Sequence, residues 1–282
     1  MVRAARRKLD FIYVGAPKSG SSWLFKALRQ HPGAYILPSK SSGHYDTDEP
    51  CPAEKHQALL DQADEGKLVG EIAHNAYLYP DTASRLRKAF PDVRVIVCLR
   101  EPGDFAISTL KWWTTHTDRF GRDIAEMTHE PHFRKLMDYS GRLEPFYAVF
   151  PSGQIKVVFF DELARDPRGF YREVCTFLGL DSAFEPQTLT EQINRTRPPR
   201  FPLFTRGIYA LGDIGRALGL ATLVEWGKHV RLVDRILYAD KASDTPPEMS
   251  AAAARERVAA RRGLSKLERL IGRPVPSAWQ QA

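Results

Sequence analysis

Apolar residues follow two alternating patterns along the first two thirds of the chain. Short, nearly continuous apolar runs, typical of strands buried on both faces, cover residues 11–14, 34–37, 67–74, 93–99 and 155–160. Between them, helical spacing or helix-forming composition covers residues 21–30, 54–65, 81–90, 105–112, 131–150 and 167–178. Asp81 is expected to cap the helix that follows it. The alternation predicts an α/β fold, with a parallel sheet and helices on both of its faces.

Strand patterns end near residue 185. Residues 194–200 form a basic loop, and residues 206–240 have an unusually apolar helical pattern. Another helix is expected to open at Pro246-Pro247-Glu248, and a last one to run from Leu264 to Ile271, ended by Gly272. No repeat or low-complexity linker divides the chain. We therefore predict one domain over residues 1–282, with an α/β core at 1–185 and a helical C-terminal part at 186–282.

The charge is unevenly distributed. The net charge is +7, and residues 195–282 hold 16 basic against 8 acidic residues. A basic C-terminal third suits a polyanionic ligand, an acidic membrane surface or solubility alone. Nucleic acid is the weaker interpretation, because no binding motif accompanies the charge.

Targeting signals are not evident. No apolar run approaches the roughly 18 residues of a membrane span, and the basic start leads into the first strand rather than a secretory leader. The three cysteines are scattered and match neither a disulfide framework nor a metal site. We expect a cytoplasmic protein.

Residues 11–24 combine a strand, a turn of small residues and the start of a helix. The first N–H groups of a helix have no partner within it, and its dipole favours negative charge at that end. Gly20 allows the backbone to approach a phosphate closely, and Lys18 adds a positive charge. This stretch predicts an anion-binding cradle.

The position of the lysine distinguishes two kinds of cradle. Gly15 and Gly20 fit the outline of the nucleotide triphosphate P-loop, in which lysine follows the second glycine. Here Ser21 occupies that place, and Lys18 lies two residues before Gly20. A P-loop kinase or NTPase remains the alternative, because Asp161-Glu162 after a strand imitates a Mg²⁺-binding acidic pair.

A second candidate site follows the strand over residues 93–99. Arg100 lies just past the end of this strand, at the edge where open α/β sheets bind ligands. Ser108 follows eight residues later on the next predicted helix. An arginine and a serine hydroxyl suit a second, separate phosphate group.

These two segments resemble the nucleotide-binding motifs of the sulfotransferases that use 3′-phosphoadenosine-5′-phosphosulfate (PAPS). Residues 17–24 (Pro-Lys-Ser-Gly-Ser-Ser-Trp-Leu) are similar to the family's 5′-phosphosulfate loop, and residues 99–108 to its 3′-phosphate segment. Weaker similarity at residues 70–73, 77–78, 159–163 and 270–279 extends over nearly the whole chain. The resemblance is closest to bacterial members and to the Golgi glycan-type branch.

The resemblance implies a P-loop-like three-layer sandwich around a parallel β-sheet, and transfer of a sulfuryl group from PAPS to a hydroxyl without a metal. The released product would be adenosine 3′,5′-bisphosphate (PAP). Arg100 and Ser108 would hold the 3′-phosphate, and Trp23 would approach the adenine or pack in the core. The 5′-phosphosulfate would be held by Lys18, Ser19, Gly20, Ser21 and Ser22. The later basic loop would close over the nucleotide through Arg195, Arg197 and Arg200.

The general base is where the chain departs from the family. Many glycan-type members carry Lys-Glu after the second strand, with the glutamate as base, whereas this chain has Lys40-Ser41. We expect His44 to be the base, because its unperturbed pKa suits the role. Glu71 and Asp46 are close alternatives, and His74 and His116 are further candidates.

The sequence does not identify the acceptor molecule. The loop at 39–53, the segment at 112–130 and the C-terminal helices are expected to shape its pocket, with contacts from Lys40, Asp46, Trp112 and Trp113. A sugar, a polyketide-type alcohol and a lipid headgroup remain open. A non-enzymatic alternative is a membrane-surface adaptor that uses residues 206–240.

Overall fold

The computed structural model describes residues 6–116, 122–190 and 245–281. The strands are β1 (Phe11–Gly15), β2 (Ala34–Ile36), β3 (Leu68–Ile72), β4 (Arg94–Leu99) and β5 (Ile155–Phe159). The α-helices are α1 (Ser21–Arg29), α2 (Ala53–Leu60), α3 (Thr82–Ala89), α4 (Pro102–His116), α5 (Ile124–His129), α6 (Pro131–Met137), α7 (Tyr139–Val149), α8 (Phe160–Arg165), α9 (Pro167–Leu178), α13 (Pro247–Ile271) and α14 (Ala278–Gln281). Short 3₁₀ turns are η1 (Ala76–Leu78), η2 (Ser152–Gln154) and η3 (Gln187–Thr190).

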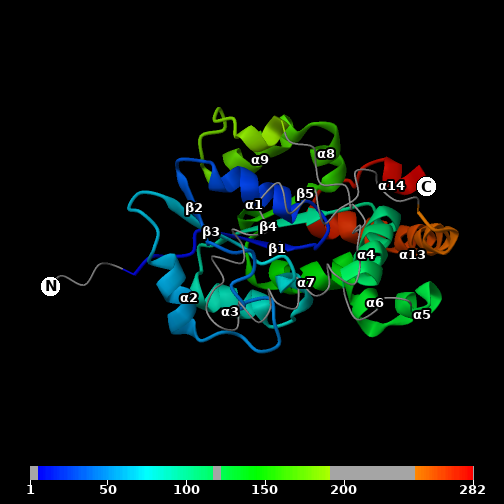
Figure 1. Ribbon diagram of the computed structural model, residues 1–282. Coiled ribbons are helices and arrows are strands. Elements are labelled where there is room, and N and C mark those ends of the chain that lie inside the picture. Colours follow the sequence, from blue (N-terminus) through cyan, green and yellow to red (C-terminus); the bar gives the residue numbers. More distant parts are fainter. Residues whose placement is uncertain (1–5, 117–121, 191–244, 282) are drawn as a thin grey trace.

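The five strands form one sheet in the order β2-β3-β1-β4-β5, and every pairing is parallel (Figure 1). The predicted parallel sheet is therefore confirmed. The chain leaves β1 toward β2 on one side and leaves β4 toward β5 on the other. The carboxyl ends of β1 and β4 thus flank a topological switch point, where open α/β sheets bind their ligands.

Alternate residues of β1 enter separate cores on the two faces of the sheet. Phe11 and Tyr13 pack into the core beneath α1 and α9, whereas Ile12 and Val14 pack into the opposite core, with residues of α3, α4 and α7. Figure 1 shows α1, α8 and α9 on one side of the sheet, and α2, α3 and α7 on the other. This is the expected three-layer arrangement, and it explains why the strands are apolar on both faces.

Several elements differ from their predicted form. The helix expected over residues 131–150 is divided into α6 and α7 at Asp138, whose carboxylate accepts a hydrogen bond from the Gly141 amide at 2.9 Å. Conversely, the two predicted C-terminal helices are one continuous α13. Helix α5 lies in the segment at 112–130, in a part for which the sequence pattern predicts no helix. Asp81 precedes α3 but makes no side-chain cap, and its carboxylate instead lies 3.7 Å from Arg85.

Helix α13 packs along α4, as Figure 1 shows. Arg257 of α13 forms ion pairs with Glu101 at 2.9 Å and with Asp104 at 3.0 Å. Glu101 in turn accepts hydrogen bonds from the Gly103 and Asp104 amides. A helix from the end of the chain thereby holds the segment that follows Arg100.

No helix in the described ranges is long and apolar enough to cross a membrane. The basic loop with Arg195, Arg197 and Arg200 and the apolar segment at 206–240 lie outside the described residues.

Candidate functional site

The two segments that predict anion binding meet at the switch point of the sheet. The loop after β1 carries Lys18, and Arg100 directly follows β4, the neighbouring strand. An Arg100 Nη1 group donates a hydrogen bond to the backbone carbonyl of Lys18 at 3.1 Å. Residues separated by 82 positions in the sequence are thus in direct contact.

Hydrogen bonds to its own backbone carbonyls hold the loop after β1 in an unusual conformation. Lys18 has φ of 60° and Gly20 has φ of 87°, both in the left-handed region. The buried Tyr13 hydroxyl donates to the Ala16 carbonyl at 2.8 Å, and the Ser19 hydroxyl to the Pro17 carbonyl at 3.3 Å. No described side chain caps the N-terminus of α1, which begins directly after Gly20. Its first amides are therefore in position to bind an anion.

Gly20 is required for a steric as well as a conformational reason, because a Cβ there would lie 2.6 Å from Leu163 Cδ2. We expect Gly20→Ala to lower the free energy of unfolding by about 2 kcal/mol or more. Gly66 is the matched control, because it has φ of 83° and no atom within 4 Å of its Cβ position. Gly66→Ala should cost only the conformational part, about 1 kcal/mol. Equal losses for both variants in urea denaturation would contradict the steric argument.

Positive charge gathers around the loop. Burial, with smaller contributions from Lys40 and Arg100, lowers the pKa of Lys18 to about 8. Lys40, from the loop after β2, donates a hydrogen bond from Nζ to the Ser22 hydroxyl at 2.7 Å. Neighbouring cations that lower the proton affinity of Lys18 make an environment that a multiply charged anion stabilises.

Arg100 is buried with part of its hydrogen-bonding capacity unused. Its guanidinium stacks on the Phe160 ring at 4.5 Å, and burial lowers its pKa. Its Nε is buried and has no partner among the described residues. The Tyr139 hydroxyl donates to the Arg100 carbonyl at 2.8 Å, which fixes the backbone at this point. Ser108 is buried on α4, two turns beyond the start of that helix.

A buried carboxylate anchors the loop that follows β2. Glu71 of β3 is fully buried, and its Oε1 accepts from the amide and hydroxyl of Ser42 at 3.2 and 2.5 Å. Its Oε2 lies 2.8 Å from Nε2 of His56. Both carboxylate oxygens are therefore engaged, Oε1 by the loop after β2 and Oε2 by His56 of α2.

The other expected base candidates lie in different surroundings. His44 is half-buried, stacks on His56 at 4.6 Å and has Nδ1 2.8 Å from the Cys51 carbonyl. Burial lowers its pKa. Asp46 is buried, and neither of its carboxylate oxygens has a hydrogen-bond partner among the described residues. His74 is the histidine found beside the cations, since Lys40 and Lys18 add to burial in lowering its pKa to about 3.

The three tryptophans that are predicted site residues differ in exposure. Trp112 is 39% exposed, and the Lys18 ammonium lies 5.6 Å from its ring centroid. Trp113 is buried against His132 and Phe133, so it occupies a core position rather than a surface that an acceptor would meet. Trp23 is buried edge-on to Phe170 and Tyr171, and its Nε1 has no partner in the described part of the chain.

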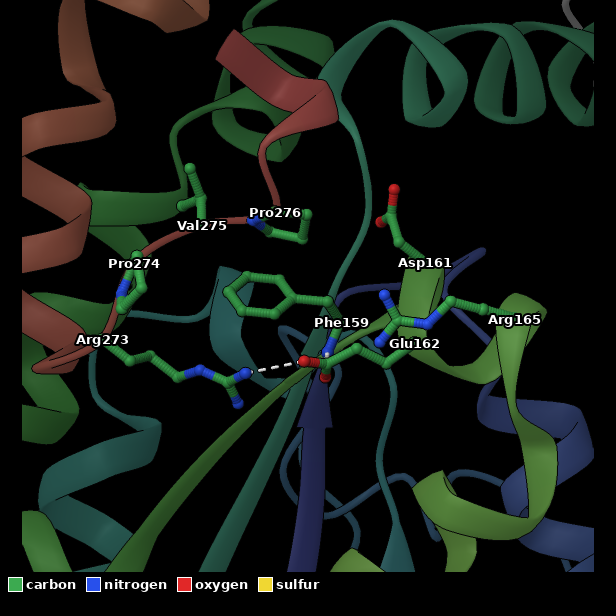
Figure 2. Close-up of a pocket in the computed structure, with 8 residues that line it drawn as sticks. All are labelled: Phe159, Asp161, Glu162, Arg165, Arg273, Pro274, Val275 and Pro276. Carbon is green, nitrogen blue, oxygen red and sulfur yellow. Dashed lines mark hydrogen bonds and ion pairs between the residues drawn. The ribbon is translucent and has the colours of Figure 1, made fainter.

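A separate cavity of about 230 Å³ lies where the C-terminal segment meets the end of β5 (Figure 2). Figure 2 shows Arg273 directed at Glu162, with which it forms a 2.6 Å ion pair. The other Glu162 oxygen accepts from the Phe159 amide, and Asp161 accepts from Trp279 Nε1 at 3.3 Å. The Asp161-Glu162 pair that imitated a Mg²⁺ site thus anchors the C-terminal segment.

Sequence reasoning did not anticipate the roles of Tyr13, Phe160 and Tyr139 in bracing the two anion-binding segments. Their signal in the sequence is weak, because aromatic residues at the ends of strands or on helices are usual in cores. Only the hydrogen bonds and ring contacts of the folded chain distinguish them.

Comparison with known proteins is consistent with this geometry. The sequence profile of the sulfotransferase family matches residues 74–186, a range that includes Arg100 and Ser108. Mouse heparan sulfate glucosamine 3-O-sulfotransferase 3A1 is 27% identical over 182 residues, which cover 60% of this chain and 45% of that protein. The mouse 3B1 protein is 26% identical over the same extent. The chain thus spans about half the length of the curated relatives it matches.

The fold is also found in a solved structure. A sulfotransferase from Alicyclobacillus acidocaldarius superimposes with a TM-score of 0.65, covering 97% of this chain and 99% of that one at 24% identity. The likeness shows that the parallel sheet and its helices have a sulfotransferase fold, and no comparison favours a kinase. Together, the profile match over residues 74–186, the two relatives and the fold support a place for this chain among the sulfotransferases.

Proposed function

We propose that the protein transfers a sulfuryl group from PAPS to a hydroxyl group of an acceptor and releases PAP. The observation that carries this proposal is the contact between Arg100 and the Lys18 carbonyl at the switch point of the sheet. It brings two separate cationic groups to one ligand-binding edge, as a nucleotide with two anionic ends requires.

The residues present suit such a nucleotide. Arg100 Nε has no partner among the described residues, and the pKa of Lys18 is depressed. Both features are expected of an anion site in the free protein. Arg100 and Ser108 would hold the 3′-phosphate. The 5′ end would be held by Lys18, Lys40, the hydroxyl of Ser22 and the first amides of α1. Ser19, Gly20 and Ser21 shape that loop, and Arg195, Arg197 and Arg200 remain proposed closing contacts.

The chemistry follows from where charge develops. In sulfuryl transfer, the bond from sulfur to the 5′-phosphate oxygen breaks, and negative charge grows on the departing phosphate. Lys18 and the fixed amides of the loop are placed to stabilise this charge without reorganising. Lys40 adds a second cation on the same side, through the hydroxyl of Ser22. No step that we propose needs a metal.

Ligand-induced thermal stabilisation tests the donor. PAP in the presence of EDTA should raise the melting temperature, because a ligand at 100 times its Kd stabilises the folded state by about 2.7 kcal/mol. ATP with Mg²⁺ at the same concentration should have little effect. Stabilisation by Mg·ATP and not by PAP would instead support the P-loop kinase alternative.

The acceptor is proposed only by class. The two mouse relatives are named for sulfation of a glucosamine hydroxyl, which favours a carbohydrate, and a small alcohol or a lipid headgroup remains open. Trp112 is the exposed ring beside Lys18 and is suited to stack against a sugar ring or an aromatic acceptor. Incubating a panel of such acceptors with PAPS and searching by mass spectrometry for the gain of one sulfuryl group would identify the class.

A further inference from the structure

The β5–α8 junction (residues 159–163) touches both segments that are proposed to bind the nucleotide. The Phe160 ring centroid lies 4.5 Å from the guanidinium carbon of Arg100. Gly20, in the loop after β1, lies so close to the junction that an added Cβ would be 2.6 Å from Leu163 Cδ2 and 3.4 Å from Phe160 Cδ2. The junction therefore supports the loop after β1 and the Arg100 side chain at the same time.

Arg273, which follows α13, holds the β5–α8 junction through two hydrogen bonds. Its Nη2 donates to Glu162 Oε1 at 2.6 Å, and its Nη1 donates to the backbone carbonyl of Val157 at 3.1 Å. Its guanidinium carbon lies 4.8 Å from the Phe159 ring centroid. The other Glu162 oxygen accepts from the Phe159 amide at 3.0 Å, so the ion pair fixes the backbone at the point where β5 ends.

Trp279 of α14 adds a second attachment. It is 2% exposed and packs edge-on against Phe159, with the ring centroids 5.3 Å apart. Its Nε1 donates to Asp161 Oδ2 at 3.3 Å. The same ring lies 6.1 Å from the ring of Tyr139, whose hydroxyl donates to the Arg100 carbonyl at 2.8 Å. Trp279 is therefore linked to Arg100 by two routes, one through Tyr139 and one through the β5–α8 junction.

Packing on this side of the junction is incomplete. The cavity of about 230 Å³ lies between the β5–α8 junction and residues 273–276 (Figure 2). Close packing resists displacement, whereas an open cavity leaves room for the junction to shift. On this side, the position of the junction therefore depends on the directional contacts from Arg273 and Trp279 rather than on continuous packing.

The Arg273 guanidinium is already occupied by groups of the protein. In addition to Glu162 and the Val157 carbonyl, Glu173 of α9 has its Oε1 3.7 Å from Arg273 Nη1. Two nearby carboxylates offset the charge of this arginine, so it is poorly suited to bind a further anion. Any effect of Arg273 on the nucleotide must then pass through the β5–α8 junction.

We propose, on the basis of the proposed function, that Arg273 and Trp279 are positioning residues for the nucleotide site. They hold the β5–α8 junction so that Arg100 and the loop after β1 keep the separation that one molecule of PAPS requires. A shift of the junction would move the Phe160 ring, and with it the Arg100 guanidinium and the backbone around Gly20. Nucleotide affinity should thus depend on two residues that do not contact the nucleotide.

Arg273→Gln tests the ion pair, because it removes the charge and keeps a hydrogen-bonding side chain. Isothermal titration well below the melting temperature should show PAP binding weakened by about tenfold, a size typical of mutations that act on a site through intervening contacts. The KM for PAPS should rise by a similar factor while kcat changes little, because the groups that act on the departing phosphate are unchanged. Full PAP affinity in folded Arg273→Gln would overturn the proposal.

Arg134→Gln is the matched control for a loss of stability alone. Arg134 of α6 forms a 3.0 Å ion pair with Glu256, which also attaches α13 to the rest of the fold. The side-chain contacts described for Arg134 are with Glu256 and the Phe133 ring, neither of which belongs to the β5–α8 junction. This variant should lower the melting temperature and leave the PAP affinity unchanged. An equal loss of affinity in both variants would refute the positioning role.

Two further variants separate the contacts. Arg273→Lys restores the charge beside Glu162 but not the planar fork that also reaches the Val157 carbonyl, so it should recover part of the affinity. Trp279→Phe keeps an aromatic ring in the core and removes the hydrogen bond to Asp161, and it should weaken PAP binding by about threefold. Wild-type affinity in Trp279→Phe would remove this hydrogen bond from the proposal.

A double-mutant cycle tests whether Arg273 acts through Glu162. The loss of PAP affinity in Arg273→Gln combined with Glu162→Gln should be smaller than the sum of the two single losses. Additive losses would mean that Arg273 acts by another route. If the wild-type protein does not bind PAP, the proposed function fails; if it binds PAP and Arg273→Gln binds equally tightly, only the positioning role fails.

Discussion

Lys18→Ala is expected to lower turnover by about a hundredfold to a thousandfold, the range for removing one preorganised stabiliser of developing charge. The affinity for PAP should fall less, because Lys40, Arg100 and the amides of α1 still bind the nucleotide. Single-turnover rates and PAP titrations on the same preparations would separate the two effects. A variant whose kcat is intact and whose KM alone rises would mean that Lys18 only binds.

The charge of Lys18 should also be visible in the pH dependence of binding. Its pKa is lowered to about 8 in the free protein, so the ammonium loses its proton as the pH rises through that value. Affinity for PAP should be constant below about pH 7 and fall above pH 8, with proton uptake on binding at the higher pH. Lys18→Arg keeps its charge throughout this range and should bind PAP without this dependence.

Arg100→Ala is expected to weaken PAP binding by about thirtyfold or more, since truncating one partner of a buried, hydrogen-bonded charge pair costs roughly 2–5 kcal/mol. It also removes the hydrogen bond to the Lys18 carbonyl, so part of the loss reflects a less ordered loop. Arg100→Lys restores the charge but not the planar guanidinium that stacks on Phe160. It should recover only part of the affinity.

Adenosine 5′-phosphate provides the matched control for Arg100. Because this ligand lacks a 3′-phosphate, the wild-type protein and Arg100→Ala should bind it with similar affinity if Arg100 recognises only that group. Isothermal titration of both ligands against both proteins completes the cycle. An equal loss of affinity for the two nucleotides would place the effect in the loop, and not in recognition of the 3′-phosphate.

Much of the fold was predictable because its signals are local. The apolar runs of β1, β4 and β5 and the helical spacing after them are read within about ten residues, and all three strands were found where expected. The helix boundaries that were predicted wrongly lie where two local interactions of similar strength compete. Asp138 can continue a helix or cap the next one, and the cap prevails between α6 and α7.

The two segments predicted to bind anions were also recognisable in the sequence, because each is a continuous strand-turn-helix unit. The choice of general base stays a prediction. Glu71 and His44 have suitable side chains, but the fold engages both Glu71 oxygens with Ser42 and His56, and stacks His44 on His56. Whether such a side chain already has contacts depends on residues that the fold brings to it, and the spacing along the chain does not reveal them.

The amino-acid sequence by itself determined the α/β class, the cradle around Lys18 and the motif that begins at Arg100. Only the tertiary structure decided which groups act on one another. The bonded contacts from Ser41 to His74, from Lys18 to Arg100, and from Glu162 to Arg273 span 33, 82 and 111 positions. Periodicity and turn chemistry report on neighbours within one element, whereas strand order and core packing bring distant residues into hydrogen-bonding range.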